Sequence, residues 1–366
     1  MAHGENPPLN ITPGAIRFNT DSMKLEYFRI GMEGGATSSY AGIGTLAAGE
    51  WVQITTDTPD IQTGGTRGVS GGGNTPAYLT DIEFVTIPST GNSTDYGDLT
   101  DSRGSLTALA SRTRAVFACG YSPGDSKLLD FITIASGGTA TVFGNNTASN
   151  NDSKRYAPSG VANSTRGLIG GGQSVAPGPA TPGTQYTDIS YITIASTGDT
   201  EDFGDLVGGG SDQSACANST RGIYAGGSPG HNIIDYVTIN TLGNAADFGD
   251  LNASSKKGGG GGGASATRGL FAGHKTPTGL NVIDYITLAS LGDAQDFGDL
   301  TTIMTYGSAC SSTTRCIWTG GYRNSTRANI IDFVTISTTG DAQDFGDLIA
   351  AKHYHTSCSN GHGGLG

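Results

Sequence analysis

The sequence has few charged residues, few cysteines and no long apolar run, and each shortage argues against a class of protein. Charged residues make up 14% of the 366 residues, and 20 basic against 32 acidic residues give a formal net charge of −12. Such a chain lacks the clustered lysine and arginine that contact nucleic-acid backbones or anionic lipid. Its apolar runs stay below the roughly 18 residues of a membrane-spanning helix. We therefore expect neither nucleic-acid binding nor membrane insertion.

The five cysteines do not form the pattern of a secreted disulfide framework. Their number is odd, and they stand inside strand-like runs, where cysteine behaves as a small apolar side chain. The first residues, Met1 to Gly4, lack the charged and then apolar segments of a secretory signal peptide. We expect free thiols in a chain that is soluble as made.

Glycine is abundant, with 60 residues, and it separates copies of a repeated sequence. The copy at 330–348 is IIDFVTISTTGDAQDFGDL, and related segments occur at 82–99, 129–146, 189–206, 234–251 and 283–300. A second repeated segment precedes each copy and begins with Thr-Arg, as in TRGIYAGG at 220–227. The six copies recur at intervals of 45 to 60 residues, which is typical of propeller blades or solenoid repeats.

Each repeat contains four short strand-like segments between glycine-rich turns, which is the strand number of a propeller blade. The first repeat enters at Thr66 without the inner strand that precedes Thr-Arg in later repeats, and a segment of that type ends the chain. We therefore predict an all-β fold, a six-bladed β-propeller in which Thr356–Asn360 completes the blade of Thr66. Strands from both ends of the repeat region would then close the ring.

Residues 1–58 lie outside the repeats and are predicted to form a small N-terminal β docking segment, with residues 59–366 as the propeller. Alternating polarity predicts a β-hairpin over 15–19 and 24–28, followed by a third strand at 50–54. So small a sheet is marginal alone, and we expect it to pack against a partner. The expected contact residues are Ile16, Phe18, Leu25, Tyr27, Trp51 and Ile54.

Both parts of the chain resemble known families. GSACSSTTRCIWTGG, followed by IIDFVTI and DAQDFGDL, resembles a kelch-type propeller blade, in which Gly-Gly ends the second strand. The combination of TRG, IDYVTI and DFGDL is also similar to repeat proteins of tailed phages, especially marine cyanophages. The opening GAIRFNTDSMKLEYF with GEWVQI is similar to a hairpin near the attachment end of phage tail fibres. These resemblances imply a kelch-like propeller carried by a virus particle.

Every repeat has an arginine after its threonine, and five of the six have an acid in the IDY segment. We predict structural ion pairs between them, because the planar guanidinium can bind a carboxylate through two parallel hydrogen bonds. A ring of arginines that binds an anionic ligand is the alternative. The predicted pairs join Arg67, Arg114, Arg221, Arg268 and Arg315 to Glu83, Asp130, Asp235, Asp284 and Asp332.

A phenylalanine precedes the glycine of the last strand in most repeats. We predict that these rings fill the widening space between the outer parts of neighbouring blades. A row of ligand-binding aromatic side chains is the alternative. The residues are Phe203, Phe248, Phe297 and Phe345.

No catalytic residue, cofactor site or metal site is predicted. The DFG triplet of the repeat is not accompanied by the other motifs of a protein kinase, and the glycine run at 258–263 lacks the Lys-Ser/Thr of a phosphate-binding loop. His353, His355, Cys358 and His362 stand close together in the sequence, but their spacing matches no standard zinc site. Metal binding by these four residues stays an open question at this stage.

We expect a non-enzymatic virion structural protein, either a tail appendage or fibre or a surface component, assembled in the host cytoplasm. Its partners would be other virion proteins through the N-terminal segment and a host-surface glycan or receptor through the propeller, with further copies of this chain as another option. Loops that differ between repeats, at 122–127, 173–186 and 228–232, are expected to face outward. A capsid decoration protein and a glycan-active propeller enzyme are the alternatives.

Overall fold

The computed structural model describes two parts of the chain, a small N-terminal sheet and a large β-propeller. The chain divides into the units Met1–Ile61 and Gln62–Gly366. The structure describes residues 15–19, 24–30, 49–53, 66–124, 126–147, 154–174, 183–228, 231–252, 261–273 and 279–365. Within these residues the one helix is the short η1 (Gly363–Leu365), so no helix there is long and apolar enough to cross a membrane.

The N-terminal sheet is antiparallel and has three strands in the order in which they occur along the chain. They are β1 (Ile16–Asn19), β2 (Lys24–Ile30) and β3 (Gly49–Gln53). The register places Phe18 opposite Leu25 and Trp51 opposite Phe28. The predicted hairpin and third strand are therefore confirmed, with β1 and β3 as the two edges of this sheet.

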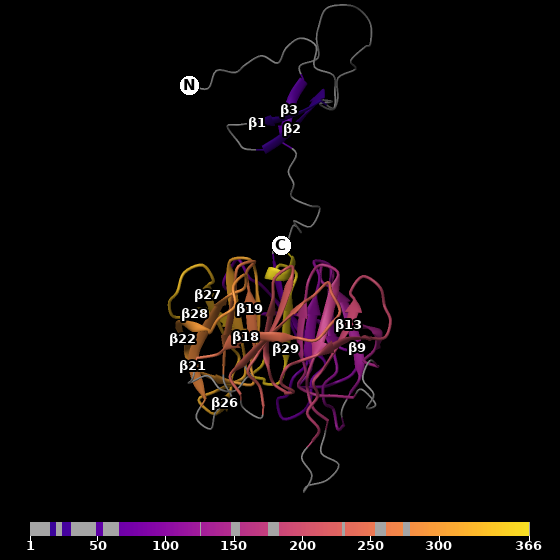
Figure 1. Cartoon of the computed structure of the whole chain (residues 1–366), viewed down its shortest axis with the longest axis vertical. Helices are drawn as coiled ribbons and strands as arrows, with labels where there is room; N and C mark the ends of the chain where they lie inside the picture. Colours follow the sequence, from indigo (N-terminus) through magenta and orange to yellow (C-terminus); the bar gives the residue numbers. More distant parts are fainter. Residues whose placement is uncertain are drawn as a thin grey trace, which may run out of the picture. The chain divides into compact units, whose positions relative to one another are not determined.

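The propeller consists of six antiparallel sheets arranged around an axis, which confirms the predicted all-β six-bladed fold (Figure 1). The first three blades have, from the axis outward, β29 (Thr356–Ser359), β4 (Arg67–Gly71), β5 (Asp81–Thr86) and β6 (Thr94–Asp98); β7 (Thr107–Ala110), β8 (Arg114–Ala118), β9 (Leu128–Thr133) and β10 (Thr141–Asn145); and β11 (Ser159–Ala162), β12 (Arg166–Gly170), β13 (Asp188–Thr193) and β14 (Glu201–Asp205).

The other three blades follow the same order, and the fifth gains two further strands at its outer edge. Their strands are β15 (Ser214–Ala217), β16 (Arg221–Ala225), β17 (Ile233–Thr238) and β18 (Ala246–Asp250); β19 (Gly262–Ala264), β20 (Arg268–Ala272), β21 (Leu280–Thr287) and β22 (Gln295–Thr305) with β25 (Tyr322–Arg323) and β26 (Thr326–Arg327); and β23 (Ser308–Ser311), β24 (Arg315–Thr319), β27 (Ile330–Thr335) and β28 (Gln343–Asp347).

The ring closes in the first blade, where the last strand of the chain becomes the innermost strand of the first repeat. β29 pairs antiparallel with β4, so that Cys358 lies opposite Val69 and Ser359 opposite Gly68. The Ser70 and Ser357 hydroxyls are 2.7 Å apart in this pair. The predicted closure by strands from both ends is confirmed.

The core lies between the blades. Apolar residues of the third strand, such as Ile234 and Val237, are buried. The repeated phenylalanines of the fourth strand pack edge to face on the aromatic residue of the third strand. Phe248, for example, is 2% exposed, and its ring centroid is 6.0 Å from that of Tyr236. Phe203, Phe297 and Phe345 are each 3% exposed, so these rings fill core space as predicted.

The turn between the third and fourth strands also joins each blade to the preceding one. Gly243 N donates to Phe203 O at 2.9 Å, and the Asn244 side chain accepts from Asp205 N at 3.1 Å. Gly204 has a φ of 145°, and a Cβ there would lie 2.5 Å from Gly243 O, so this close approach requires glycine. Equivalent hydrogen bonds from Gly91, Gly138, Gly198, Gly292 and Gly340 connect the other neighbouring blades.

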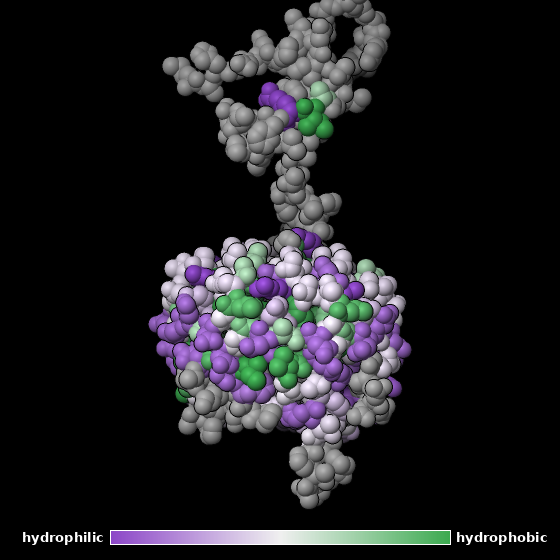
Figure 2. All heavy atoms as spheres, viewed as in Figure 1, coloured by the Kyte–Doolittle hydropathy of each residue, from purple (hydrophilic) through white to green (hydrophobic). Residues whose placement is uncertain are grey.

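The outer wall of the propeller is mainly polar. Figure 2 shows hydrophilic side chains over most of the visible wall, with apolar side chains in separate small patches. The large hydrophobic side chains that are more than half exposed each belong to a different blade, so they do not form one apolar surface. They are Val142, Val207, Leu242, Leu291 and Ile349.

Candidate ligand-binding site

The antiparallel strand order gives the propeller two different faces. The Thr-Arg turns and the turns between third and fourth strands lie on one face, which we call the constant face because its turns share the repeated sequence. The second strands end, and the third strands begin, at the opposite face, and the connections between them in the sequence are 72–80, 119–127, 171–187, 226–232, 273–279 and 320–329. We call this the variable face, since these connections differ in length and sequence.

The C-terminal tail closes the axial channel at the constant face, where Figure 1 shows the chain end. His362 Nε2 donates to Ala110 O at 2.8 Å, and Arg112 hydrogen-bonds Leu365 O. Gly364 packs so tightly that a Cβ there would lie 2.1 Å from Ala162 O. Access to the channel is therefore from the variable face.

A ring of equivalent residues surrounds the channel at the variable face. Each stands two positions before an inner strand and has a left-handed backbone, with φ between 52° and 58°. The equivalent residue of the fifth blade, Gly259, lies outside the described residues. The described members, which we call the mouth ring, are Ser105, Ala157, Asp212, Tyr306 and Tyr354.

Backbone hydrogen bonds connect the members of the mouth ring from blade to blade. Ser105 N donates to Tyr354 O, and Ala157 N donates to Ser105 O, both at 2.7 Å. Asp212 N donates to Ala157 O at 2.9 Å, and Tyr354 N donates to Tyr306 O at 3.0 Å. These bonds fix the positions from which the five side chains leave the backbone.

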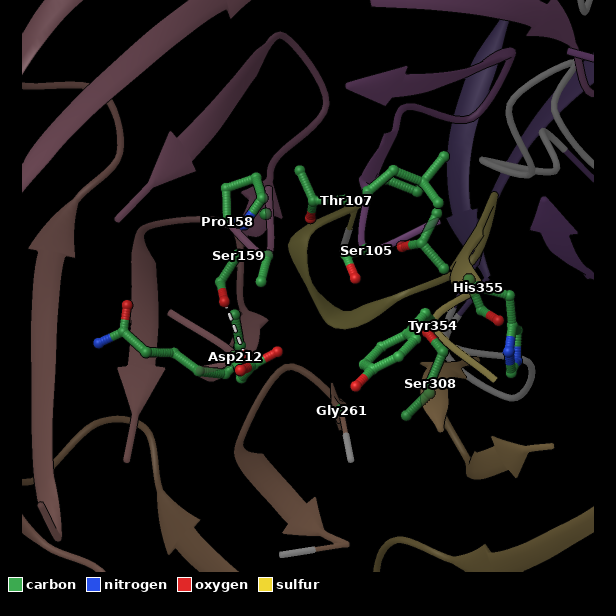
Figure 3. A pocket seen from close by; sticks show the side chains of 18 of the residues that line it. Ser105, Thr107, Pro158, Ser159, Asp212, Gly261, Ser308, Tyr354 and His355 are labelled. Carbon is green, nitrogen blue, oxygen red and sulfur yellow. Dashed lines mark hydrogen bonds between the residues drawn. The ribbon is translucent and has the colours of Figure 1, made fainter. Parts of the chain in front are cut away.

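The mouth ring surrounds a cavity of about 110 Å³ that opens toward the variable face (Figure 3). On the same scale a single water needs roughly 10–15 Å³, so the cavity has space for several waters or part of a larger molecule. Hydroxyl groups of the inner strands, including Thr107, Ser308 and Thr356, line it one layer deeper. Below them the channel narrows to a second cavity of about 70 Å³ among small residues such as Ala108 and Gly263.

Aromatic side chains gather at one side of this mouth. The ring centroids of Tyr306 and Tyr354 are 4.5 Å apart, and His353 lies 4.4 Å from Tyr354 and 4.5 Å from Tyr322. Tyr322 is in β25, which belongs to the hairpin that breaks the regularity of the blades. The aromatic cluster therefore occupies the place where the propeller departs most from its repeat.

In the described part of the mouth, the charge comes from a single carboxylate. Among the described residues lining the cavity, Asp212 is the one acidic residue, and lysine and arginine are absent. Figure 3 shows Asp212 and Tyr354 extending into the cavity from facing blades. Burial and the neighbouring Tyr306 and Asp212 raise the pKa of Tyr354.

His355, which also lines the cavity, is a buried and neutral residue. Its Nε2 is 2.8 Å from Thr319 Oγ1. Burial lowers its pKa well below the usual value, and the nearby charge of Lys352 adds to this effect. The described part of the mouth therefore presents hydroxyls, tyrosine rings and one negative charge.

The predicted pairing of the repeated arginines with the IDY acids is wrong. Arg221 lies opposite Thr238, whereas Asp235 lies opposite Tyr224, three residues further along the strand. An odd offset places the two side chains on opposite faces of the sheet. Arg67, Arg114, Arg268 and Arg315 have the same register relative to Glu83, Asp130, Asp284 and Asp332.

The arginines instead link each blade to the next. Arg221 Nη1 donates to Leu288 O at 2.6 Å, and its guanidinium lies 5.0 Å from the centroid of the Tyr236 ring. Equivalent hydrogen bonds run from Arg67, Arg114, Arg166, Arg268 and Arg315 to Ile134, Ile194, Ile239, Ile336 and Ile87. The repeated arginine is therefore structural, but through main-chain carbonyls and an aromatic ring.

Three of the predicted acids pair with other cations. Asp130 and Arg103 are fully buried with 2.9 Å between Oδ2 and Nη2, and Asp332 is 2.7 Å from Arg323. Glu83 pairs with Lys352. In the third blade, where the IDY position holds Ser190, the ion pair is moved to Asp188 and Arg155.

The two remaining acids are also buried. Asp235 accepts from Val207 N at 3.1 Å and Gly208 N at 3.4 Å, and burial raises its pKa. Asp284 is 0% exposed. The repeat pattern indicated the acids but not their partners, although basic residues two positions before Ser105, Ala157 and Tyr354 could have indicated three of the cations.

The histidines near the C-terminus have separate hydrogen-bond partners. His353 Nδ1 is 2.9 Å from Asn74 O, whereas His355 and His362 bind Thr319 and Ala110. Cys358 and the other four cysteines are buried free thiols, as expected. Among the described residues, no group of three or more His, Cys, Asp or Glu side chains could hold a metal ion.

The expected docking residues are only partly within the described structure. Ile16, on edge strand β1, is 65% exposed. Phe18, Leu25, Tyr27 and Trp51 belong to strands β1 to β3, but their side chains lie outside the described part, as does all of Ile54. Docking by these residues remains a prediction.

Comparisons with known proteins do not show a family for this chain. No family model matches the sequence, and no curated protein matches it at the significance required. The fold and the geometry of the channel mouth therefore carry the functional argument.

The mouth ring was not among the residues predicted from the sequence. Aligning the repeats on their arginine would have placed Ser, Ala, Asp, Gly and Tyr at one position amid otherwise similar sequence. That variation is the available indication of a ligand-facing position. What the sequence could not supply is that this position bends into a left-handed conformation beside the channel.

Proposed function

We propose that this chain is a non-enzymatic component of a virus particle, with residues 1 to about 58 attached to other particle proteins and the propeller displayed for binding a host-surface glycan or receptor. The observation that carries the binding half is the difference between the two faces. The constant face is closed by the C-terminal tail, whereas the variable face has dissimilar loops around an open, tyrosine-lined mouth. Binding proteins commonly place recognition on variable loops over a rigid scaffold.

The chain connectivity favours this division of work. The propeller begins at Thr66 on the constant face, where Gly361 packs against it and Asn360 Oδ1 accepts from Arg67 N at 2.8 Å. The chain therefore enters the propeller at Thr66, on the face opposite the mouth. Attachment through the N-terminal segment would leave the variable face accessible, and many copies on one particle would strengthen weak contacts.

The particle setting rests on the sequence, through the likeness of the repeats and the N-terminal hairpin to proteins of tailed phages. Attachment would use the edges of the small sheet, since unpaired strand edges can take up a strand from a partner. A hydrolase is supported less well. Glycoside hydrolysis uses two carboxyl groups about the scissile bond, and the described lining of the mouth supplies Asp212 alone.

The attachment half is tested by deleting residues 1–58. The remainder should fold as a propeller with an unchanged melting profile, yet fail to enter particles when supplied during infection in place of the full chain. Normal incorporation of the truncated chain would place the attachment surface on the propeller and refute this half of the proposal.

The binding half is tested with the full chain on a glycan array, together with a reducing-sugar assay on any glycan that binds. Binding without release of reducing ends is the expected result. Release of reducing ends that is lost in Asp212→Asn would instead identify a glycan-active enzyme.

A further inference from the structure

The geometry points to one neutral sugar residue, at the end of a glycan, as the group that enters the channel mouth. We infer that its ring stacks on Tyr306 and Tyr354 and that its hydroxyls bind Asp212 and the hydroxyl layer below. This inference rests on the proposed display of the variable face to host glycans. It adds the ligand class and the residues that bind it.

The shape of the cavity favours the end of a chain over its middle. The channel is closed at the constant face by the C-terminal tail and narrows below the mouth to a cavity of about 70 Å³. A polymer therefore cannot pass through the ring. A terminal residue can insert partly into the mouth cavity of about 110 Å³ while the rest of the glycan lies on the variable face.

Two tyrosines give the mouth the surface that a sugar ring needs. Tyr306 and Tyr354 come from neighbouring blades, their rings tilt by 58°, and both are half-buried. The C–H face of a pyranose is apolar and packs on aromatic rings, while its edge carries hydroxyls. The Tyr354 ring extends toward Asp212, so one ligand can contact ring and carboxylate together (Figure 3).

Hydrogen-bonding groups lie below this platform and across the cavity from it. Thr107, Ser308 and Thr356 line the cavity and can donate or accept, and the Asp212 carboxylate can accept from two adjacent sugar hydroxyls. Ser159 donates to Gln213 O at 2.6 Å, so its hydroxyl hydrogen is used within the cavity wall and is not offered to a ligand. A polyol fits this set better than an apolar ligand.

The charge of the mouth selects against acidic sugars. An anionic ligand would approach Asp212 without a compensating lysine or arginine in the described lining, and His355 is kept neutral by burial. A buried unpaired charge is costly, so a carboxylated or sulfated sugar should bind poorly. Lys256 and Lys257 lie outside the described residues and supply the matched test of this argument.

The backbone of the mouth ring supports a ligand-facing role for its side chains. The left-handed conformation favours glycine, and side chains other than Asn, Asp or Gly there cost of order 1 kcal/mol each. Two of the five described positions nevertheless hold tyrosine. Large side chains at strained positions beside a cavity are expected where the side chain is used.

The test uses the full chain and two panels of immobilised oligosaccharides, one ending in glucose, galactose, mannose or N-acetylglucosamine, the other in sialic or uronic acid. Wild-type protein should bind members of the neutral panel. Tyr354→Ala should reduce affinity at least tenfold, and Asp212→Asn several-fold. Asparagine tolerates the left-handed conformation, so Asp212→Asn separates lost binding from lost folding.

The matched control is Tyr121→Ala, which removes a half-buried tyrosine of the same face that does not line the cavity. It should bind like wild type. If wild type binds neutral glycans but both mouth variants bind equally well, the ligand lies elsewhere on the propeller, and the mouth inference fails while the proposed function stands.

Two other outcomes also overturn the inference. Preference for the acidic panel that disappears in a Lys256→Gln/Lys257→Gln variant would show an anionic ligand. Absence of binding to both panels would remove the sugar ligand and with it the glycan-binding half of the proposed function. The particle-incorporation experiment would still decide the attachment half separately.

Discussion

The arginines that pair with buried acids and the arginines that recur with the repeat have different roles, and the surroundings of the guanidinium decide between them. Arg103 is fully buried, and so is the Asp130 that it contacts at 2.9 Å. Arg114 of the same blade is half-buried, donates to Ala195 O at 2.9 Å and lies 4.7 Å from the centroid of Phe131. Asp130 and Arg114 both recur with the repeat, which is why the sequence predicted that they would pair.

Replacing these two arginines should have unequal effects on stability. Arg103→Met leaves the Asp130 carboxylate buried without its partner and should cost about 3–5 kcal/mol. Arg114→Met loses the hydrogen bonds to Ile194 O and Ala195 O and a cation–π contact at a half-buried site, and should cost about 1–2 kcal/mol. Urea unfolding of both variants measures the difference. Asp130→Asn added to Arg103→Met should recover part of the loss, and equal costs for the single variants would contradict the assignment.

Neighbouring blades also fit through complementary residue sizes. A Cβ on Gly222 would lie 2.7 Å from Val161 Cγ2, and one on Gly269 would lie 2.7 Å from Cys216 Sγ. Between the fifth and sixth blades the arrangement is reversed. The glycine there, Gly263, belongs to the preceding blade, and the larger residue that it faces, Cys316, belongs to the following blade. A small residue in one blade therefore accompanies a larger one in the next.

Gly222→Ala should destabilise the propeller by about 1–3 kcal/mol through overpacking. The added methyl group has no space beside Val161, so Val161→Ala in the same chain should restore most of the loss. Gly198→Ala is the control, since nothing lies within 4 Å of a Cβ there. Thermal unfolding of the three variants is the measurement, and a loss that persists beside Val161→Ala would show that the backbone, and not the contact, is responsible.

For the strands, the sequence was sufficient to predict the structure within one repeat. Short segments between glycine-rich turns predicted the four strands of each blade, and the missing inner strand at Thr66 predicted the partner of β4. Contacts between repeats were not accessible in the same way. The turn between third and fourth strands hydrogen-bonds the preceding blade, and the mouth ring joins Tyr354 to Ser105, so both link residues whose proximity follows only from the ring.

The closing segment around β29 should be sensitive to acid. Burial lowers the pKa of His353 to about 4, and it also lowers the pKa values of His355 and His362. In the unfolded chain these imidazoles take up protons near pH 6.5. The unfolded state therefore binds more protons below that pH, and stability is lost as the pH falls from about 7 toward 4.

The measurement is the melting temperature between pH 8 and pH 4.5 for wild type and for His355→Gln. Glutamine can retain a hydrogen bond to Thr319 but does not titrate, so the variant should lose less stability on acidification. Parallel curves for the two proteins would assign the acid sensitivity to carboxylates elsewhere.

At the scale of the whole molecule, the C-terminal residues both close the ring and plug its channel. Deleting residues 350–366 removes β29 together with Lys352, the partner of Glu83. The melting temperature should then fall by at least about 10 °C. Each kcal/mol of lost unfolding free energy lowers it by roughly 2–4 °C in a domain of 150–250 residues and by less in a larger one. Deleting 361–366 removes only the plug and should have a much smaller effect. Similar losses for the two truncations would contradict closure by β29.

The position of β4 has a mechanical consequence. The chain enters the propeller at Thr66, and β4 runs from there along the axis toward the mouth, between β29 and β5. If the N-terminal segment is attached to a particle while the mouth binds a glycan on a cell, a pulling force acts on β4 along its length. Its hydrogen bonds to β29 and β5 are then loaded in shear, so they must break together and not one after another. The strand pair that closes the ring is therefore oriented to resist a pulling force along the chain.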